Sequence, residues 1–186
     1  MNLDRKSHNK WIIFSSLGWL FGVLLTLIFS VSFDAFGIEG LQFFMAIGMG
    51  LGMGYMQWRF LDAHIKISKQ WIFYLTIGLT IPFLILDLIK QFIYFQPNAL
   101  LIALCISLGS IISGILQIRL IKPYIKSNIS WILFSFLGWT LAGLSIFSVD
   151  YTHHISDHNL TLFFINLLAL LAGGPIVGLI TRLGFR

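Results

Sequence analysis

The residues of this sequence that could do chemistry are few, and the first set is a pair of amides. The pattern Gly-x-x-Gln-x-Arg occurs twice, with Gln57 before Arg59 and Gln117 before Arg119. Amides enclosed by apolar helices form interhelical hydrogen bonds, usually worth about 1 kcal/mol or less. Converging amides can also line a small polar site. Both interpretations fit this pair.

A carboxylate and an amine form the second candidate. Asp87 and Lys90 lie three residues apart, a spacing at which side chains on a helix can pair. Asp87 follows Trp71 by sixteen residues, which is about 24 Å along a helix. We expect an ion pair at the end of an apolar helix. A cation-binding carboxylate at a pore mouth is the alternative.

A polar stretch near the C-terminal end holds the third candidate. It contains four potential metal ligands, of which two could share a helix face at i and i+4. A solvated loop is the main interpretation, and pH sensing or metal binding are alternatives. The four residues are His153, His154, Asp157 and His158.

Catalytic and phosphate-binding signatures are missing from the sequence. His-Glu-x-x-His, Gly-x-Ser-x-Gly and Gly-x-x-x-x-Gly-Lys do not occur. We therefore expect a protein that is not an enzyme and carries no cofactor. The net charge of +5 would be compatible with nucleic acid, but the basic residues form short clusters between apolar stretches. Such clusters are typical of contacts with anionic lipid, and we expect no nucleic-acid partner.

The elements that position these residues are membrane helices. The chain is 58% hydrophobic and only 10% charged, whereas soluble domains are about 25% charged. A spanning helix needs about 20 mostly apolar residues. The sequence therefore predicts one all-α membrane domain over residues 1–186, with membrane lipid as its surroundings. Six stretches are long enough: 11–31, 41–61, 71–89, 99–121, 131–149 and 160–183.

Charge sets the expected orientation. Every Lys and Arg except Lys90 falls on one side of the six stretches, and basic residues mark the cytoplasmic side. We expect the cell inner membrane, with both termini cytoplasmic. Arg59 and Arg119 then extend toward lipid phosphate. Trp11, Trp71 and Trp131 would lie at the cytoplasmic interface with their indole N–H groups in contact with water.

These tryptophans also reveal a repeat with a period of 60 residues. The segment from Trp11 to Trp19 matches the segment from Trp131 to Trp139 at seven of nine positions. The copies predict three helical hairpins, at 11–70, 71–130 and 131–186. Neighbouring copies of such repeats usually pack on one another. We expect a compact pseudo-threefold bundle.

Small residues four apart indicate how the helices pack, because they let two backbones approach closely. They occur in each hairpin, and flexibility for a gate is the alternative interpretation. The glycines of greatest interest are Gly50, Gly54, Gly114, Gly174 and Gly178.

The repeat resembles a helical hairpin of bacterial membrane proteins, common in cyanobacteria. Its pattern is Gly-x-x-x-Gly-x-x-Gln, a basic linker, and Trp with Gly-Trp some seven residues on. The middle copy has Leu79 in place of the second tryptophan. The resemblance implies the hairpin topology and no particular activity. It is carried by Gly50, Gly54, Gln57, Trp131, Gly138 and Trp139.

Three functions remain open. The first is a non-enzymatic membrane subunit that acts within a larger complex or as a homo-oligomer. The second is a small transporter or channel, because internal repeats are common in those folds; Pro175, after Gly173 and Gly174, marks the best candidate for an unwound segment. The third is an intramembrane enzyme, which would depend on His154 and His158.

Overall fold

The computed structural model describes residues 5–38, 40–93, 95, 97–147 and 159–185, and these residues are almost entirely helical. Two 3₁₀ turns, η1 (Lys122–Tyr124) and η3 (Arg182–Gly184), follow the fourth and sixth long helices. The all-α prediction is confirmed for the described residues. The six long helices are α1 (Arg5–Ala35), α2 (Phe43–Ile65), α3 (Gln70–Phe92), α4 (Ala99–Ile121), α5 (Asn128–Phe147) and α6 (Asn159–Thr181).

Five of the six helices are long and apolar enough to cross a membrane, and α2 is the exception. Six spans were expected from the sequence. The alternating glycines of α2, together with Gln57 and Arg59, lower its mean hydropathy. The same glycines are buried against neighbouring helices. A helix that gives so much of its surface to other helices exposes less of it to lipid, so its composition is less apolar.

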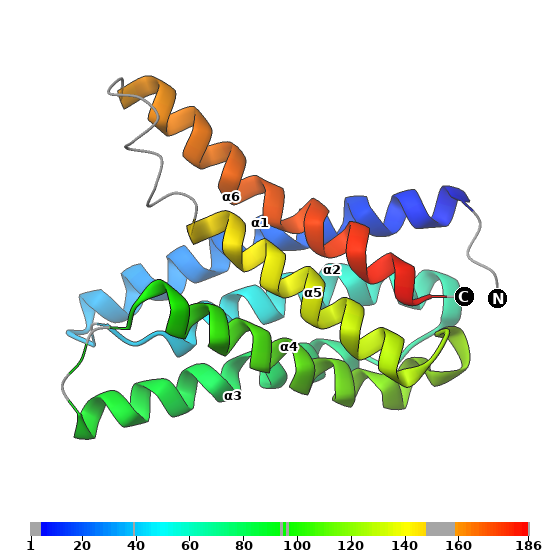
Figure 1. The fold of residues 1–186 in the computed structure, drawn as a ribbon, viewed down its shortest axis with the longest axis horizontal. Helices are drawn as coiled ribbons and strands as arrows, with labels where there is room; N and C mark the ends of the chain where they lie inside the picture. Colours follow the sequence, from blue (N-terminus) through cyan, green and yellow to red (C-terminus); the bar gives the residue numbers. More distant parts are fainter. Residues whose placement is uncertain (1–4, 39, 94, 96, 148–158, 186) are drawn as a thin grey trace.

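The helices form a closed ring in chain order (Figure 1). Each helix packs against the next one in the chain, and α6 returns to pack against α1. Short connections join α1 to α2, α2 to α3, α3 to α4 and α4 to α5, and make these pairs antiparallel neighbours. No helix therefore occupies the centre of the ring, and side chains fill its interior.

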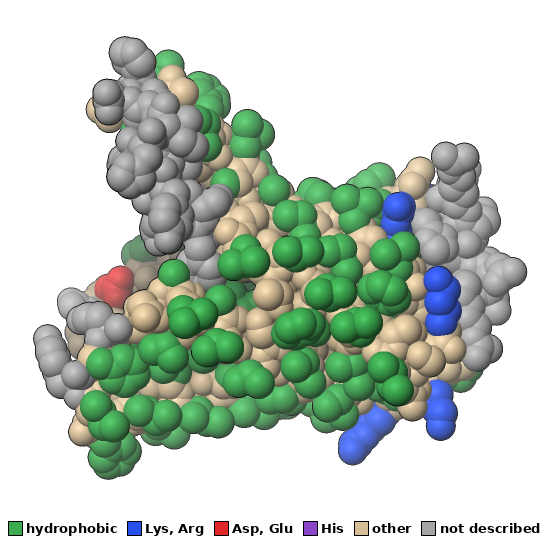
Figure 2. All heavy atoms as spheres, in the orientation of Figure 1, with side chains coloured by type: hydrophobic (Ala, Val, Ile, Leu, Met, Phe, Trp, Pro, Cys, Tyr) green, Lys and Arg blue, Asp and Glu red, His purple; other side chains and the backbone are tan. Residues whose placement is uncertain are grey.

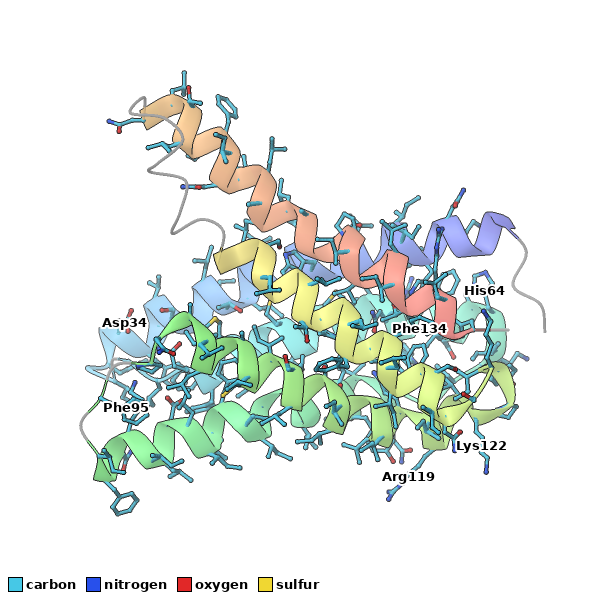
Figure 3. The ribbon with its side chains drawn as sticks, in the orientation of Figure 1. Asp34, His64, Phe95, Arg119, Lys122 and Phe134 are labelled. Atoms are coloured by element: carbon cyan, nitrogen blue, oxygen red, sulfur yellow. The ribbon has the colours of Figure 1, made fainter. Side chains whose placement is uncertain are left out.

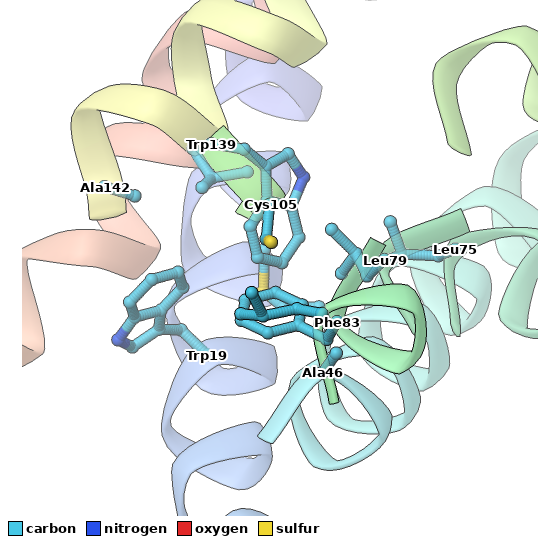
Figure 4. Close-up of a cluster of buried hydrophobic side chains, with 11 residues drawn as sticks. Trp19, Ala46, Leu75, Leu79, Phe83, Cys105, Trp139 and Ala142 are labelled. Atoms are coloured by element: carbon cyan, nitrogen blue, oxygen red, sulfur yellow. The ribbon is translucent and has the colours of Figure 1, made fainter. Parts of the chain in front are cut away.

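Two clusters of buried side chains occupy that interior. The first, which we call the distal cluster, draws residues from all six helices. Figure 4 shows its centre, where Trp19 of α1, Phe83 of α3 and Trp139 of α5 approach one another. The second, the tryptophan cluster, consists of Trp11, Phe60, Leu61, Ile67, Trp71, Ile121, Ile125, Trp131 and Phe185.

Basic side chains gather at one end of the ring, which we call the basic end. Figure 2 shows Lys and Arg at that end and apolar side chains over most of the remaining visible face. Figure 3 places Arg119 and Lys122 at the basic end and Asp34 at the opposite, distal end. The separation expected from the sequence therefore exists in three dimensions.

The distal half of α6 departs from the compact bundle that the sequence suggested. It diverges from α5 (Figure 1), and its Leu160 and Leu168 are about 70% exposed. Pro175 lies inside α6 and cannot donate a backbone hydrogen bond within the helix. Trp19 donates its indole N–H to the carbonyl of Leu170 at 2.8 Å, which ties α6 to α1 at this level.

Substituting Gly78 by alanine should destabilise the ring. A methyl group on Gly78 would lie 2.5 Å from the backbone of Ser113, so α3 and α4 would have to separate. We expect a loss of about 1–3 kcal/mol in the free energy of unfolding in detergent. Gly114→Ala is the matched control, since its methyl group meets its nearest neighbour at 3.5 Å. Equal stabilities for the two variants would contradict this packing.

Candidate functional site

The tryptophan cluster brings together the three repeated tryptophans at the basic end. Their rings are almost completely buried. Trp71 and Trp131 lie 6.0 Å apart between centroids, and Phe185 lies 5.0 Å from Trp131 and 5.1 Å from Trp11. The expectation that their indole N–H groups contact water is therefore wrong. The helices converge here, and the rings pack against one another and against Phe60.

The indole N–H groups of these tryptophans differ in their partners. Trp11 Nε1 donates to Thr181 Oγ1 at 2.9 Å, which joins the first helix to the last. The Nε1 atoms of Trp71 and Trp131 are buried without a hydrogen-bond partner. Burial without an acceptor costs an N–H donor about 1–3 kcal/mol.

The same kind of helix–helix contact occurs three times around the ring. Each time it involves the isoleucine that directly follows one of the three repeated tryptophans. In each case a glycine of the neighbouring helix faces the backbone of an isoleucine. The three contacts are Gly54 with Ile72, Gly114 with Ile132 and Gly178 with Ile12. The residue three positions after each glycine is Gln57, Gln117 or Thr181, and all three are buried. Thr181 therefore occupies the place of the glutamines in the third hairpin.

Buried polar residues lie between the two clusters of the interior. Gln57 Nε2 donates to Ser15 Oγ at 3.4 Å, from α2 to α1. Gln117 of α4 and Ser135 of α5 are each 3% exposed. The bond from Gln57 to Ser15 joins two helices, and none of these four side chains carries a charge. Arg59 and Arg119, two residues beyond the glutamines, are exposed at the surface.

Asp87 is buried and binds the start of another helix. Its Oδ2 accepts the backbone N–H groups of Gln42 at 2.7 Å and Phe43 at 2.8 Å, at the N-terminus of α2. A carboxylate in this position satisfies two donors and complements the helix dipole. The sequence offered no signal for this contact, because it joins residues about 45 positions apart.

Lys90 does not bond to Asp87, in contrast to the predicted ion pair. Lys90 Nζ donates to the carbonyl of Gly40 at 2.7 Å, and the second oxygen of Asp87 has no hydrogen-bond partner. Asp87 and Lys90, both on α3, thus bind the connection between α1 and α2 and the first residue of α2. They hold that connection against α3 and do not form a free carboxylate at a pore mouth.

The predicted packing glycines differ in how tightly they are enclosed. A methyl group on Gly50 would lie 2.5 Å from Thr76 Cα, and one on Gly174 would lie 2.7 Å from Ser16 Cα. Gly54 and Gly178 are similarly close to α3 and α1, at 3.0 and 2.8 Å. Gly114 has more room, as its nearest neighbour at 3.5 Å shows. The contact between α4 and α5 is therefore the loosest of these.

The predicted metal ligands His153, His154, Asp157 and His158 lie outside the described residues. Within the part of the chain that the structure describes, no group of three or more His, Cys, Asp or Glu residues could hold a metal ion.

A small apolar cavity of about 50 Å³ lies inside the distal half of the ring. Side chains of α1 to α5 line it, including Trp19, Met49, Phe83 and Trp139. Such a cavity stays dry and takes only apolar groups.

Sequence reasoning missed Phe60 and Phe185, which complete the tryptophan cluster. A signal for Phe185 existed, because Phe185 follows Ile125 by one repeat period of 60 residues. The two residues also pair through an isolated β-bridge, and Lys126 N donates to Gly184 O at 3.0 Å. The end of the chain is thus bonded to the connection between α4 and α5.

Comparisons with protein-family models, curated proteins and solved structures find no match for this chain.

Replacing Asp87 by alanine should loosen the start of α2. Two backbone N–H groups would lose their acceptor in a buried place, at a cost of about 1–3 kcal/mol each. We expect a lower unfolding temperature and faster hydrogen exchange at Gln42 and Phe43. Asp62→Ala removes an exposed carboxylate from the same protein and serves as control. Unchanged exchange in the Asp87 variant would refute the capping role.

Thr181→Val should cost more stability than Thr80→Val. Both threonines bond to their own helix four residues back, but only Thr181 also accepts an indole N–H from another helix. Valine at 181 leaves Trp11 unpaired and buried, which we expect to cost about 1–3 kcal/mol. Unfolding in detergent, followed by tryptophan fluorescence, measures both variants. Equal losses would mean that the bond contributes nothing to stability.

Proposed function

We propose that this chain is a multi-pass membrane protein that acts as a non-enzymatic subunit, through protein partners or by self-assembly. The observation that carries the proposal is the tryptophan cluster. Three indole rings, Phe60 and Phe185 fill the ring at its basic end. A ring that is filled in this way serves better as a scaffold than as a conduit.

Six crossings, including one by α2, are part of the proposal. Two observations support the sixth. The N-terminus of α2 is bonded to Asp87 toward the far end of α3, and its C-terminus leads into Lys66 and Lys69 of the basic end. In addition, α2 packs against both α1 and α3, and this packing compensates for the modest hydropathy of α2.

The pseudo-threefold arrangement of hairpins rests on the repeated contacts. Glycine meets isoleucine in the same way between α2 and α3, α4 and α5, and α6 and α1. In this arrangement the hairpins 11–70, 71–130 and 131–186 take equivalent places. In the third hairpin the glycine of this contact is shifted by four residues, as Gly178 shows, whereas Trp131 keeps the period of 60.

The proposed partners bind the outside of the ring, within the membrane. Large apolar side chains cover much of that outer surface on α1, α3, α4, α5 and α6. In lipid such a surface drives no association by itself, so close packing at small residues and interhelical hydrogen bonds would decide which partner binds. A second copy of the chain or another membrane protein fits this description.

The cytoplasmic location of both ends, and the bacterial inner membrane, belong to the same proposal. The positions of the described basic residues support this orientation. All of them except Lys90 lie at the basic end, where α1 begins and η3 ends. Exposed Arg59 and Arg119 would there contact lipid phosphate.

Purification in a mild detergent tests the assembly. We expect the chain to elute with a second protein in fixed stoichiometry, or as a homo-oligomer of defined mass. Light scattering gives the mass, and mass spectrometry identifies the companion. A monomer that carries out a measurable activity without any partner would overturn the proposal.

The alternative is a small transporter, which one observation favours. The distal half of α6 diverges from α5, and Gly173, Gly174 and Pro175 follow it in the same helix, beside a ring that holds an apolar cavity. Under this alternative, Pro175→Ala and Gln57→Leu would change solute flux in liposomes. Under the proposal, both variants leave flux at the level of empty liposomes while the oligomeric state persists.

Thiol labelling tests the orientation. In a Cys105→Ala background, Ser68→Cys and Gln91→Cys place single thiols at exposed positions of opposite ends. We expect a membrane-impermeant maleimide added to intact cells to label the thiol at 91 and to leave the one at 68 unlabelled. Permeabilised cells provide the control, since both should react. The reverse pattern would place the termini outside.

A further inference from the structure

A groove at the distal end differs in character from the interior of the ring. It lies between the end of α1, the start of α2 and the connection that joins them, and its volume is about 350 Å³. Ligand sites typically have about 300–1,000 Å³, with mostly apolar walls and a few convergent polar groups. Thr26, Ser30 and Asp34 supply the polar side here, and Leu27, Phe33 and Phe44 part of the apolar side.

The electrostatics of this groove favour a cation. Asp34 lies one residue before the end of α1, where the helix dipole is negative, so its carboxylate sits at an unfavourable end of the helix. Its Oδ2 accepts one hydrogen bond, from Ser30 Oγ at 3.5 Å. Lys90 is bound to the same connection, but its ammonium group donates to the carbonyl of Gly40.

The apolar wall offers a surface for the remainder of a ligand. Phe33 and Phe44 stack with their centroids 3.8 Å apart and their planes at 11°. Leu27, two turns before Asp34 on α1, is 56% exposed. An aromatic ring near a carboxylate also favours a cation through its face.

The position of the groove matches the depth of lipid headgroups. Asp34 lies 23 residues after Trp11, which corresponds to about 34 Å along α1. The hydrocarbon core of a bilayer is about 30 Å thick. The carboxylate would therefore reach the distal headgroup region while Leu27 remains at the level of the acyl chains.

We propose that this groove binds a primary ammonium group carried on an apolar body, with the ammonium on Asp34 and Ser30 and the apolar part along Leu27 and the Phe33–Phe44 pair. The ethanolamine headgroup of a phospholipid and a free amine with an apolar chain share this chemistry. The binding requires no partner protein, so it stands apart from the function proposed above.

Binding of short-chain phosphatidylethanolamine to the purified full-length chain tests the proposal. We expect Asp34→Asn to weaken binding about tenfold, because a charge-assisted hydrogen bond is lost. Asp62→Asn, at an exposed carboxylate of α2, should bind like the wild type. Short-chain phosphatidylglycerol, which lacks the amine, should bind weakly and equally to all three proteins.

A second pair of variants tests the groove without changing its charge. Ser30→Phe fills the groove and should abolish binding, whereas Ser32→Phe, at an exposed position that does not line it, should leave binding intact. If the Ser30→Phe variant unfolds at the same temperature as the wild type, its loss of binding is not caused by misfolding. Equal affinity of the Asp34 and Asp62 variants, or of the two serine variants, would overturn the proposal.

A free amine then separates the two sources of the ammonium group. Phenethylamine that displaces the phospholipid from the wild type, and not from Asp34→Asn, would show that the groove accepts the amine alone. Phospholipid binding that depends on Asp34 but resists phenethylamine would assign the site to the lipid headgroup. Displacement that is independent of Asp34 would contradict the site.

Discussion

Close approach of helix backbones at small residues is the constraint on which the rest of this structure depends. Gly52 lies directly against Gly22, and Gly78 against Ser113, so that α1 meets α2 and α3 meets α4 without intervening side chains. Gly174 and Gly178 bring α6 equally near to α1. In lipid, where apolar surfaces gain little by meeting one another, such contacts supply the dispersion energy that holds helices together. Bulkier residues at these places would widen the ring and open its interior.

The interior is filled according to the same geometry. When the helices stand close, large side chains must share the space inside the ring, and the three repeated tryptophans meet Phe60 and Phe185 there. Some polar groups next to them bond across helices, as Trp11 does with Thr181. Asp87 does the same at the distal end, since its carboxylate accepts from the backbone of α2. These polar groups thus join helices to one another, whereas several hydroxyl groups bond within their own helix.

The helices themselves were predictable from sequence, and their mutual contacts only in part. Apolar stretches of sufficient length predicted α4 at 99–121 with the bounds that the structure gives it. The spacing of Gly54, Gly114 and Gly178 indicated helix packing, because small residues four apart let two helix backbones approach closely. The burial of Trp71 could not be read in this way. A tryptophan at the end of an apolar stretch looks the same whether it faces lipid headgroups or other helices.

The candidate site shows the same limit. Gln57 and Gln117 were identified as a pair because the repeat places them at matching positions. Thr181 takes the place of the glutamine in the third hairpin, and its bond to Trp11 depends on how the last helix meets the first. Asp87 and Lys90 were expected to pair with each other, since spacing along one helix is visible in the sequence. Their actual partners, at the start of α2 and at Gly40, belong to another hairpin and depend on tertiary structure.

The bond between the first helix and the last has a consequence for biosynthesis. A membrane protein enters the bilayer helix by helix, in the order of its translation. The face of α1 that carries Ile12 and Ser16 is covered by Gly178 and Gly174 of α6. If the six helices insert in this order, that face stays in contact with lipid, or with the insertion machinery, until α6, the fifth helix after α1, has been inserted. During that interval the indole of Trp11 lacks Thr181, and the nascent chain is an open arc whose two free edges can meet the edges of another chain.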